Sequence, residues 1–260
     1  MRSRRAHRRR ELFTDHFSEL AHEYASRRPR YPEELFGYLG SVCRGHELAW
    51  DCAAGTGQAT IPLTRHFRRV VATDASEAML AQAPPHLGVQ YRVAPAGLSG
   101  MANASADLVT VAQALHWLDL DEFYREVHRV LVPGGILAVW TYGAQVTDSD
   151  TLNRLLQTFY TDVVGPYWAP ERRHVEAGYR TLPFPYPELA SPRFTMAEEW
   201  TLGELLGYLG TWSATQSFRR ANHRDPVEDL ARHLMPCWGD PSVARPIHWP
   251  LSLRLGAKST

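Results

Sequence analysis

The chain has 260 residues, 44% of them hydrophobic, and its 28 basic and 28 acidic residues give a formal net charge of zero. This length allows one domain with a substantial core, and the balanced charge argues against nucleic-acid binding through a general basic surface. No apolar run approaches the roughly 20 residues that span a membrane. The 3 cysteines are far apart and the first residues lack an apolar signal segment, so we expect a cytoplasmic protein without disulfides.

The amino-terminal part of the chain contains three predicted segments. Residues 1–10 are rich in arginine and lack apolar periodicity, which is typical of a disordered basic tail, although such an arm can also bind nucleic acid or an acidic partner. Apolar residues recur at helical spacing over 11–26 and predict a helix there. Prolines follow this helix and end it, and a second helix is expected over 33–42.

A strand, a tight turn and a helix are predicted between residues 48 and 66. Residues 48–52 form a short apolar run, the turn contains only small residues, and 58–66 continues with helical spacing. Glycines let the backbone pass close to a ligand, and the first N–H groups of a helix can bind a polar group. The stretch favours the opening of a nucleotide-binding α/β unit, although glycines also occur in such turns for geometry alone. The candidate residues are Asp51, Ala53, Gly55 and Gly57.

The next predicted strand, over 70–74, ends on an acid. Asp74 lies where doubly wound folds place the ribose of a nucleotide, and its carboxylate can accept hydrogen bonds from both ribose hydroxyls. The other interpretation is that Asp74 caps the helix that begins near Ser76, since short polar residues are favoured there. The two roles are compatible.

Two nucleotide ligands fit this pattern, NAD and S-adenosylmethionine. The dinucleotide fingerprint requires a third glycine at the position that Thr60 occupies. The carboxylate of Asp51 would repel a pyrophosphate, whereas it suits the ammonium group of a methionine moiety. The charges therefore favour S-adenosylmethionine.

The end of the fourth predicted strand carries the most informative titratable residue. Strands are expected over 89–93 and 106–111, and the second of these ends near His116 and Trp117 at the carboxyl edge of the sheet. His116 is a candidate general base, because its reference pKa lies near neutrality. Alternatively it orients the substrate or holds the loop. Trp117 is expected to form a wall of the reaction pocket.

The rest of the chain completes the sheet and adds a region of different composition. We expect a helix over 120–131 and a strand over 136–142. Residues 48–142 thus alternate between strand and helix five times, which is the signature of a parallel sheet with helices on both faces. Residues 143–192 are rich in proline and aromatic residues, which suits a lid over a small-molecule pocket or a packed connection. Further elements are expected at 149–163, 194–201, 202–213, 225–235 and 245–255. Weak substrate-side candidates are Tyr208, Trp212 and His223, and no histidine spacing predicts a metal site.

Four stretches, taken together, resemble the successive motifs of class I S-adenosylmethionine-dependent methyltransferases. They are 51–58, 74–80, 112–117 and 129–135. Within that class the chain is most similar to the small-molecule branch that includes trans-aconitate methyltransferases. The resemblance implies an α/β Rossmann-like, doubly wound sheet of seven strands, mostly parallel, with the last strand antiparallel beside the fifth. It implies one domain over 11–260, with a helical cover (11–45), a cofactor-binding core (46–142), a lid-like insertion (143–192) and a segment that completes the sheet (193–260).

The resemblance also implies roles for individual residues. Tyr24 or Arg28 would meet the methionine carboxylate, since arginine binds carboxylates through two charge-assisted hydrogen bonds. Relatives place an acid near the adenine after the third strand, but here the chain has Ala96 and Gly97, whose backbone would take over the contact. The other implied cofactor residues are Asp74, Ala75, Met79 and, through its backbone, Gln113. His116 and Trp117 would face the acceptor.

These observations predict transfer of the methyl group of S-adenosylmethionine to a small molecule with a carboxylate or hydroxyl acceptor. Two alternatives stay open, an NAD-dependent oxidoreductase and a non-catalytic S-adenosylmethionine-binding protein. The expected product is S-adenosylhomocysteine. We expect a monomer or weak dimer that binds neither nucleic acid nor membrane.

Overall fold

The computed structural model describes residues 28–260. The predicted tail over 1–10, the predicted helix over 11–26 and Tyr24 lie outside the described residues. In the described part of the chain, no helix has both the length and the apolar character needed to cross a membrane.

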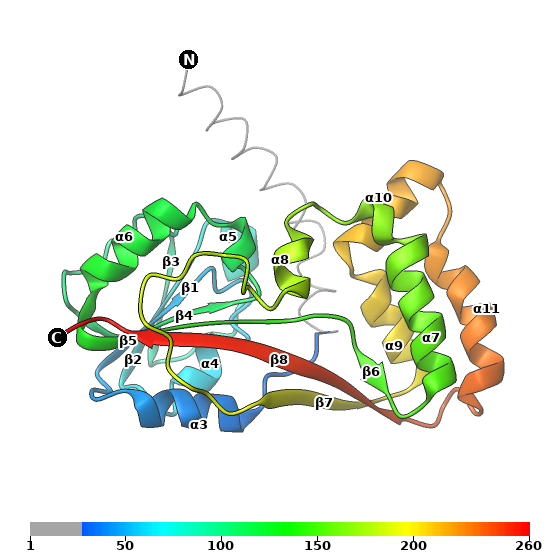
Figure 1. Cartoon of the computed structure of the whole chain (residues 1–260), viewed down its shortest axis with the longest axis horizontal. Helices are drawn as coiled ribbons and strands as arrows, with labels where there is room; N and C mark the ends of the chain where they lie inside the picture. Colours follow the sequence, from blue (N-terminus) through cyan, green and yellow to red (C-terminus); the bar gives the residue numbers. More distant parts are fainter. Residues whose placement is uncertain (1–27) are drawn as a thin grey trace, which may run out of the picture.

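Five parallel strands form the centre of the sheet, in the order β3–β2–β1–β4–β5 (Figure 1). Their bounds are β1 Leu48–Cys52, β2 Arg69–Asp74, β3 Val89–Val93, β4 Ala106–Ala112 and β5 Leu131–Tyr142. All five were predicted from short apolar and β-branched runs. The strand order reverses between β1 and β4, and doubly wound sheets bind their ligands at the carboxyl edge of that switch point.

Three antiparallel pairings with β8 (Arg245–Ala257) complete the sheet. Residues 251–257 of β8 pair with β5, and residues 245–251 pair with β7 (Phe194–Trp200). β6 (Val146–Thr147) pairs with residues 247–248 and so continues the β5 side of β8. The predicted Rossmann-like fold, mostly parallel with the last strand antiparallel beside the fifth, is confirmed. The sheet has eight strands where seven were expected, because the chain after β5 stays beside β8 long enough to form β6.

Helices cover both faces of the parallel strands, and successive side chains of each strand point to opposite faces. α3 (Glu33–Val42) and α4 (Thr60–Leu63) share one core with Ala49, Leu108 and Trp140. α6 (Leu120–Val130) shares the other core with Trp50 and Val109. Each strand thus buries side chains on both sides, as expected for a parallel sheet between helical layers.

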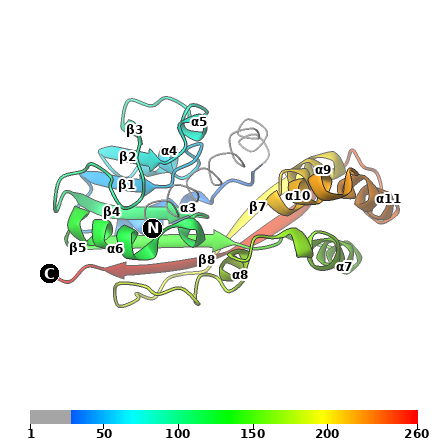
Figure 2. The same cartoon turned by 90° about the horizontal axis from the view of Figure 1, so that it is seen from above.

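A helical body lies at the far end of β7 and β8, away from the parallel strands (Figures 1 and 2). Its helices are α7 (Asp150–Thr158), α9 (Leu202–Gly210), α10 (Ser213–Asn222) and α11 (Pro226–Trp238). A π-helical turn, η2 (Phe159–Val163), extends α7 and leads into the short turns η3 (Gly165–Tyr167) and α8 (Arg172–Glu176). α8 lies against the end of β5 and the turn η1 (Leu115–Trp117) that follows β4. The segment predicted as a lid therefore links the helical body to the sheet edge.

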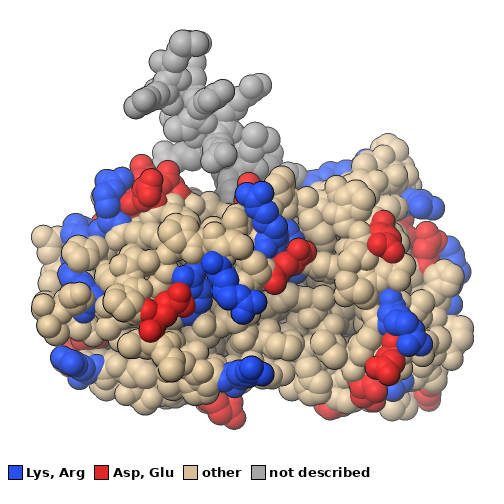
Figure 3. Space-filling view, viewed as in Figure 1, with Lys and Arg blue, Asp and Glu red and all other residues tan. Residues whose placement is uncertain are grey.

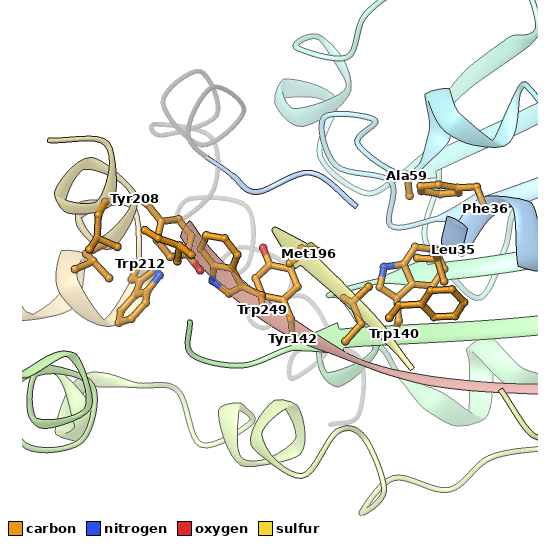
Figure 4. Packing of buried hydrophobic residues seen from close by; sticks show 14 of the residues in the cluster. Leu35, Phe36, Ala59, Trp140, Tyr142, Met196, Tyr208, Trp212 and Trp249 are labelled. Atoms are coloured by element: carbon orange, nitrogen blue, oxygen red, sulfur yellow. The ribbon is translucent and has the colours of Figure 1, made fainter. Parts of the chain in front are cut away.

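Buried aromatic side chains join the helical body to the sheet (Figure 4). Trp249 of β8 lies 5.6 Å from Tyr208 of α9, measured between ring centroids, and Tyr208 lies 5.7 Å from Trp212. Trp140 and Tyr142 of β5 continue the same buried cluster toward α3. One continuous core thus fixes the helical body to the sheet, because these large rings are removed from water on both sides of the junction.

Candidate functional site

Four residues in the left-handed backbone region lie where β1 and β4 end. They are Ala53 with φ 55°, Gly55 with φ 57°, Gly57 with φ 83° and Gln113 with φ 57°. Because β1 and β4 are paired in parallel, Ala53 and Gln113 follow strand ends at the same edge of the sheet. Residues other than glycine rarely adopt this conformation, and such strain clusters at functional sites. The edge at the switch point is therefore the candidate site.

The two glycines of the turn have close neighbours in addition to positive φ angles. A Cβ at Gly55 would lie 3.3 Å from Cε of Met79, and a Cβ at Gly57 would lie 3.2 Å from the hydroxyl oxygen of Tyr91. Neither position has room for a side chain without movement of a neighbour. The turn therefore presents bare backbone, and the side chain of Met79 lies against it.

Asp74 joins the turn to the second strand. Its Oδ2 accepts a hydrogen bond of 2.8 Å from the N–H of Gly55, and its Oδ1 accepts one of 2.8 Å from the N–H of Ser76. Ser76 itself caps α5 (Glu77–Leu80), because its hydroxyl accepts from the N–H of Met79. Burial raises the pKa of Asp74, and the backbone hydrogen bonds oppose that rise. Asp74 is only half-buried, and it is followed by the exposed Ala75, so its carboxylate lies at the edge where a ribose would bind.

Asp51 lies beneath the turn and is fully buried. Its carboxylate accepts hydrogen bonds of 2.6 Å from the Thr60 hydroxyl and 2.9 Å from the Thr110 hydroxyl. Burial raises its pKa to about 6, against the opposing effect of these two hydrogen bonds. The group is thus mainly ionised at neutral pH. It can act on a bound cationic group through its charge, from below the backbone of the turn.

The side chain of Gln113 is held by the end of β5. Its amide nitrogen donates a hydrogen bond of 3.0 Å to the carbonyl of Tyr142, and its amide oxygen accepts one of 3.2 Å from the N–H of the same residue. The Thr141 hydroxyl donates to that oxygen as well. These bonds explain how a non-glycine residue is held at positive φ. The backbone N–H of Gln113 donates a hydrogen bond of 2.9 Å to the carbonyl of Trp140, so its backbone carbonyl is the part left to a ligand.

His116 and Trp117 lie side by side in η1, with ring centroids 4.6 Å apart. The Nδ1 atom of His116 is hydrogen-bonded to the hydroxyl of Tyr179 at 2.9 Å. Burial, together with the charge of Arg172 and the neighbouring His174, lowers the pKa of His116 to about 3. The imidazole is therefore neutral at physiological pH and weakly basic. This favours the orienting role over that of general base.

Tyr179 is a residue of this site that sequence reasoning missed. It is fully buried and has φ 61°, which is unusual for a bulky side chain. The guanidinium of Arg254 holds its backbone by donating a hydrogen bond of 2.6 Å to the Tyr179 carbonyl. The sequence offers one aromatic residue among many in the segment after β5, and only the fold shows that this one reaches His116.

We expect the imidazole of His116 to stay neutral from pH 8 down to about pH 4. Because its folded-state pKa is lowered, protonation below the unfolded value of about 6.5 favours the unfolded state, and His116 reduces stability as the pH falls through that value. NMR titration of ¹⁵N-labelled histidine, with His116→Asn for assignment, measures this directly. A His116 midpoint between pH 6 and 7 would contradict the buried geometry and restore the general-base role.

The loop after β3 has no carboxylate of its own, but one lies next to it. A Cβ at Gly97 would lie 2.8 Å from Cβ and 3.2 Å from Oε2 of Glu122, an exposed residue in the first turn of α6. The loop is fixed by the buried Glu126, which accepts hydrogen bonds from the backbone and the hydroxyl of Ser99. Ala96 packs on the α6 side of the core. The sequence could not indicate Glu122, because its position is that of an ordinary solvent-facing helix residue.

Arg28 and two substrate-side candidates meet at the junction with the helical body. Nη1 of Arg28 lies 3.4 Å from the hydroxyl of Tyr142, and its guanidinium carbon lies 5.6 Å from the centre of the Tyr208 ring. Tyr208 and Trp212 are in contact and buried, whereas His223 is exposed at the end of α10 and does not join them. Among residues 28–260, no group of three or more potential ligands could hold a metal ion.

The chain was compared with known proteins. The family described as "Methyltransferase domain" matches residues 50–139. A protein of Dictyostelium discoideum named as a methyltransferase is 30% identical over 229 residues, which cover 87% of each chain. A solved structure titled as a type II methyltransferase from Anaeromyxobacter dehalogenans is 43% identical, covers 90% of this chain and 99% of its own, and has a TM-score of 0.85.

A methyltransferase of Mycobacterium tuberculosis, named as uncharacterized, is 36% identical over 132 residues, which cover 48% of this chain and 51% of its own. The doubly wound sheet and its glycine turn define a class I, S-adenosylmethionine-dependent enzyme fold. The chain belongs to the S-adenosylmethionine-dependent methyltransferases, and the predicted family is confirmed.

Proposed function

We propose that this chain transfers the methyl group of S-adenosylmethionine to a small molecule, where an oxygen atom of a carboxylate or hydroxyl group accepts it. The observation that carries the proposal is the placement of Asp74, whose carboxylate lies between the glycine turn and the start of α5. The NAD alternative is not favoured, because the turn lacks the third glycine and has the Asp51 charge beneath it. The resemblance to trans-aconitate methyltransferases is compatible with this acceptor class.

The residues of the edge fit S-adenosylmethionine in shape and charge. The bare backbone of Gly55 and Gly57 permits close approach, and Asp74 offers carboxylate oxygens to the ribose hydroxyls. Asp51 would stabilise the ammonium group through its charge, while Arg28 and the backbone carbonyl of Gln113 would bind the rest of the methionine moiety. Ala53 and Ala75 belong to the same lining.

Recognition of the adenine involves a second strand end and α6. Met79 and Ala96 would pack against the ring, and the backbone of Gly97 would contact its edge. The carboxylate of Glu122, which lies next to Gly97, would supply the acceptor for the exocyclic amino group that the loop itself lacks. Gly97 has to be small, because Glu122 occupies the space that a side chain there would fill.

When S-adenosylmethionine is bound, a lone pair of the acceptor oxygen forms the new bond to the methyl carbon while the carbon–sulfur bond breaks with its electrons on sulfur, which gives S-adenosylhomocysteine. A carboxylate acceptor becomes an ester without loss of a proton, so a neutral His116 suffices to orient it. A hydroxyl acceptor has to lose its proton, for which the weakly basic His116 is poorly suited. Trp117 and the aromatic residues of the junction exclude water and align the acceptor, the contribution that positioning makes to such reactions. We therefore favour the carboxylate.

The test is transfer of a radiolabelled methyl group from S-adenosylmethionine to a panel of small carboxylic acids, phenols, duplex DNA and tRNA. We expect label on a carboxylic acid, released by mild alkali as an ester would be, and none on the nucleic acids. Asp74→Ala serves as the control that weakens the cofactor site. Binding of S-adenosylmethionine without transfer to any acceptor would support the non-catalytic alternative, and label on nucleic acid would contradict the proposal.

A further inference from the structure

A hollow of about 360 Å³ lies between η2, η3 and α8, apart from the glycine turn. Its walls include Tyr160, Trp168, Arg172, Arg173 and Glu176. Two arginines and one glutamate give these walls a formal charge of plus one. Figure 3 shows basic side chains beside acidic ones over α8, on a face where both signs are otherwise interspersed. The charge of the hollow favours an anionic ligand.

The guanidinium of Arg172 is held in a fixed position within this hollow. Its central carbon lies 4.5 Å from the centre of the Trp168 ring and 5.5 Å from that of Tyr160. Its Nε donates a hydrogen bond of 2.9 Å to the hydroxyl of Tyr160, and that hydroxyl donates one of 2.8 Å to Oε1 of Glu176. Within residues 28–260 the two Nη groups of Arg172 have no hydrogen-bond partner. They form the planar fork that binds a carboxylate through two hydrogen bonds.

The indole of Trp168 also lines the hollow. The indole Nε1 of Trp168 is buried, and no residue of the described chain accepts its hydrogen bond. Because this N–H is enclosed by protein, it offers no donor to the hollow, and the indole contributes its ring to the wall. Trp168 stacks with Tyr160 at 5.4 Å and with Trp212 at 5.5 Å between ring centroids. The indole ring is thus set in a wall of aromatic rings.

The hollow adjoins the proposed reaction site through α8 and through the aromatic residues. α8 lies against η1, which carries His116, and the charge of Arg172 is close enough to act on that imidazole. On the other side, Trp212 connects the hollow to Tyr208 and to Arg28 above it. The hollow and the proposed reaction site are therefore neighbours, and Arg172 acts on His116 through its charge.

We propose that this hollow binds a carboxylate of the methyl acceptor, with the two Nη groups of Arg172 as donors. The aromatic walls suit an acceptor with a flat, conjugated or aromatic body next to that carboxylate. The bound carboxylate anchors the acceptor, and the group that is methylated is a second one, nearer to His116. The inference rests on the proposed function, because it treats the ligand as the methyl acceptor.

Calorimetric titration with benzoate tests the site on the whole protein saturated with S-adenosylhomocysteine. Benzoate is a flat carboxylate, and benzamide is its neutral counterpart. We expect benzoate to bind and benzamide to bind at least 10-fold more weakly. Arg172→Gln should weaken benzoate binding roughly 10- to 150-fold, as expected for loss of charge-assisted hydrogen bonds. Arg180→Gln, which removes an exposed arginine just after α8, is the matched control and should leave the affinity unchanged.

The remaining measurements separate the two proposals. Trp168→Phe keeps an aromatic ring in the wall, and it should weaken benzoate binding less than Arg172→Gln does, without changing the affinity for S-adenosylhomocysteine. Equal benzoate affinity in wild type and Arg172→Gln, or no benzoate binding to a protein that binds S-adenosylhomocysteine, would overturn the assignment of the hollow. Failure of S-adenosylhomocysteine itself to bind would instead overturn the proposed function.

Discussion

Replacement of Asp74 by alanine is expected to weaken S-adenosylmethionine binding about 10- to 150-fold, equivalent to roughly 1.5–3 kcal/mol. The carboxylate would lose charge-assisted hydrogen bonds to the ribose. It would also release the N–H of Gly55, which it holds at 2.8 Å, so that the glycine turn loses part of its support. Calorimetric titration of the variant with S-adenosylmethionine gives the affinity directly.

Asp74→Asn separates the charge from the shape of this side chain. The amide retains one oxygen acceptor, so we expect an affinity between those of the wild type and Asp74→Ala. Circular dichroism and the thermal unfolding midpoint establish that both variants fold. A folded Asp74→Ala protein with unchanged affinity would remove the ribose role and leave Asp74 as a support for the turn and the start of α5.

Asp51→Asn is expected to change the pH dependence of stability more than any other single carboxylate replacement discussed above. The folded-state pKa of Asp51 is raised to about 6 from the ordinary value of 3.8. The folded protein therefore binds this proton more tightly than the unfolded chain. The resulting stabilisation is complete below pH 3.8 and is lost as the pH rises through 6.

At neutral pH the ionisation of Asp51 destabilises the folded protein by roughly 2–4 kcal/mol, because a shift of one pKa unit corresponds to about 1.4 kcal/mol. Asparagine does not ionise. The unfolding free energy of Asp51→Asn, measured relative to that of the wild type, should therefore increase by about this amount as the pH rises from 4 to 7. Urea unfolding across this range measures the difference. Asp121→Asn, which removes a carboxylate from the exposed first turn of α6, is the control. If the difference in unfolding free energy between Asp51→Asn and wild type stays constant across this range, ionisation of Asp51 does not destabilise the folded protein.

The same variant should bind S-adenosylmethionine more weakly, because the negative charge beneath the turn is lost. Retention of a buried charge at a cost in stability is typical of functional groups, whose pKa values are shifted by their surroundings. The Asp51 carboxylate is also what distinguishes this turn from one that binds a pyrophosphate.

The parallel strands and the family could be predicted from the sequence because their signals are local. Buried parallel strands are short apolar runs, and the predicted bounds over 48–52 and 89–93 agree with β1 and β3. Helix ends were less predictable. The predicted helix over 58–66 is only α4, Thr60–Leu63, because the N–H and hydroxyl of Thr64 both bind the Ile61 carbonyl and tighten the last turn.

Elements with weak apolar patterns were missed. α10 (Ser213–Asn222) is rich in serine, threonine and glutamine and buries only Ala214, Thr215 and Phe218, so its periodicity gives little signal. β6 has two residues and exists only because β8 passes beside it. Neither element can be recognised from its own composition.

The residues of the candidate site also differ in how far the sequence could predict them. Asp51, Asp74 and the glycines lie within short motifs whose spacing fixes their positions at one sheet edge. Glu122 and Arg172 reach the site from α6 and α8, and their contacts depend on how those helices pack. Burial of His116 likewise arises from Tyr179, 63 residues further along the chain. Long-range packing of this kind has no local signature in a single sequence.

The most direct test of the account is calorimetric titration of the purified protein with S-adenosylmethionine, S-adenosylhomocysteine and NADH. We expect micromolar binding of the first two ligands and no binding of NADH. The charge of Asp51 and the absence of a third glycine are the reasons for that selectivity. Binding of NADH in preference to S-adenosylmethionine, or binding of none of the three, would contradict the assignment of the glycine turn and Asp74 as the cofactor site.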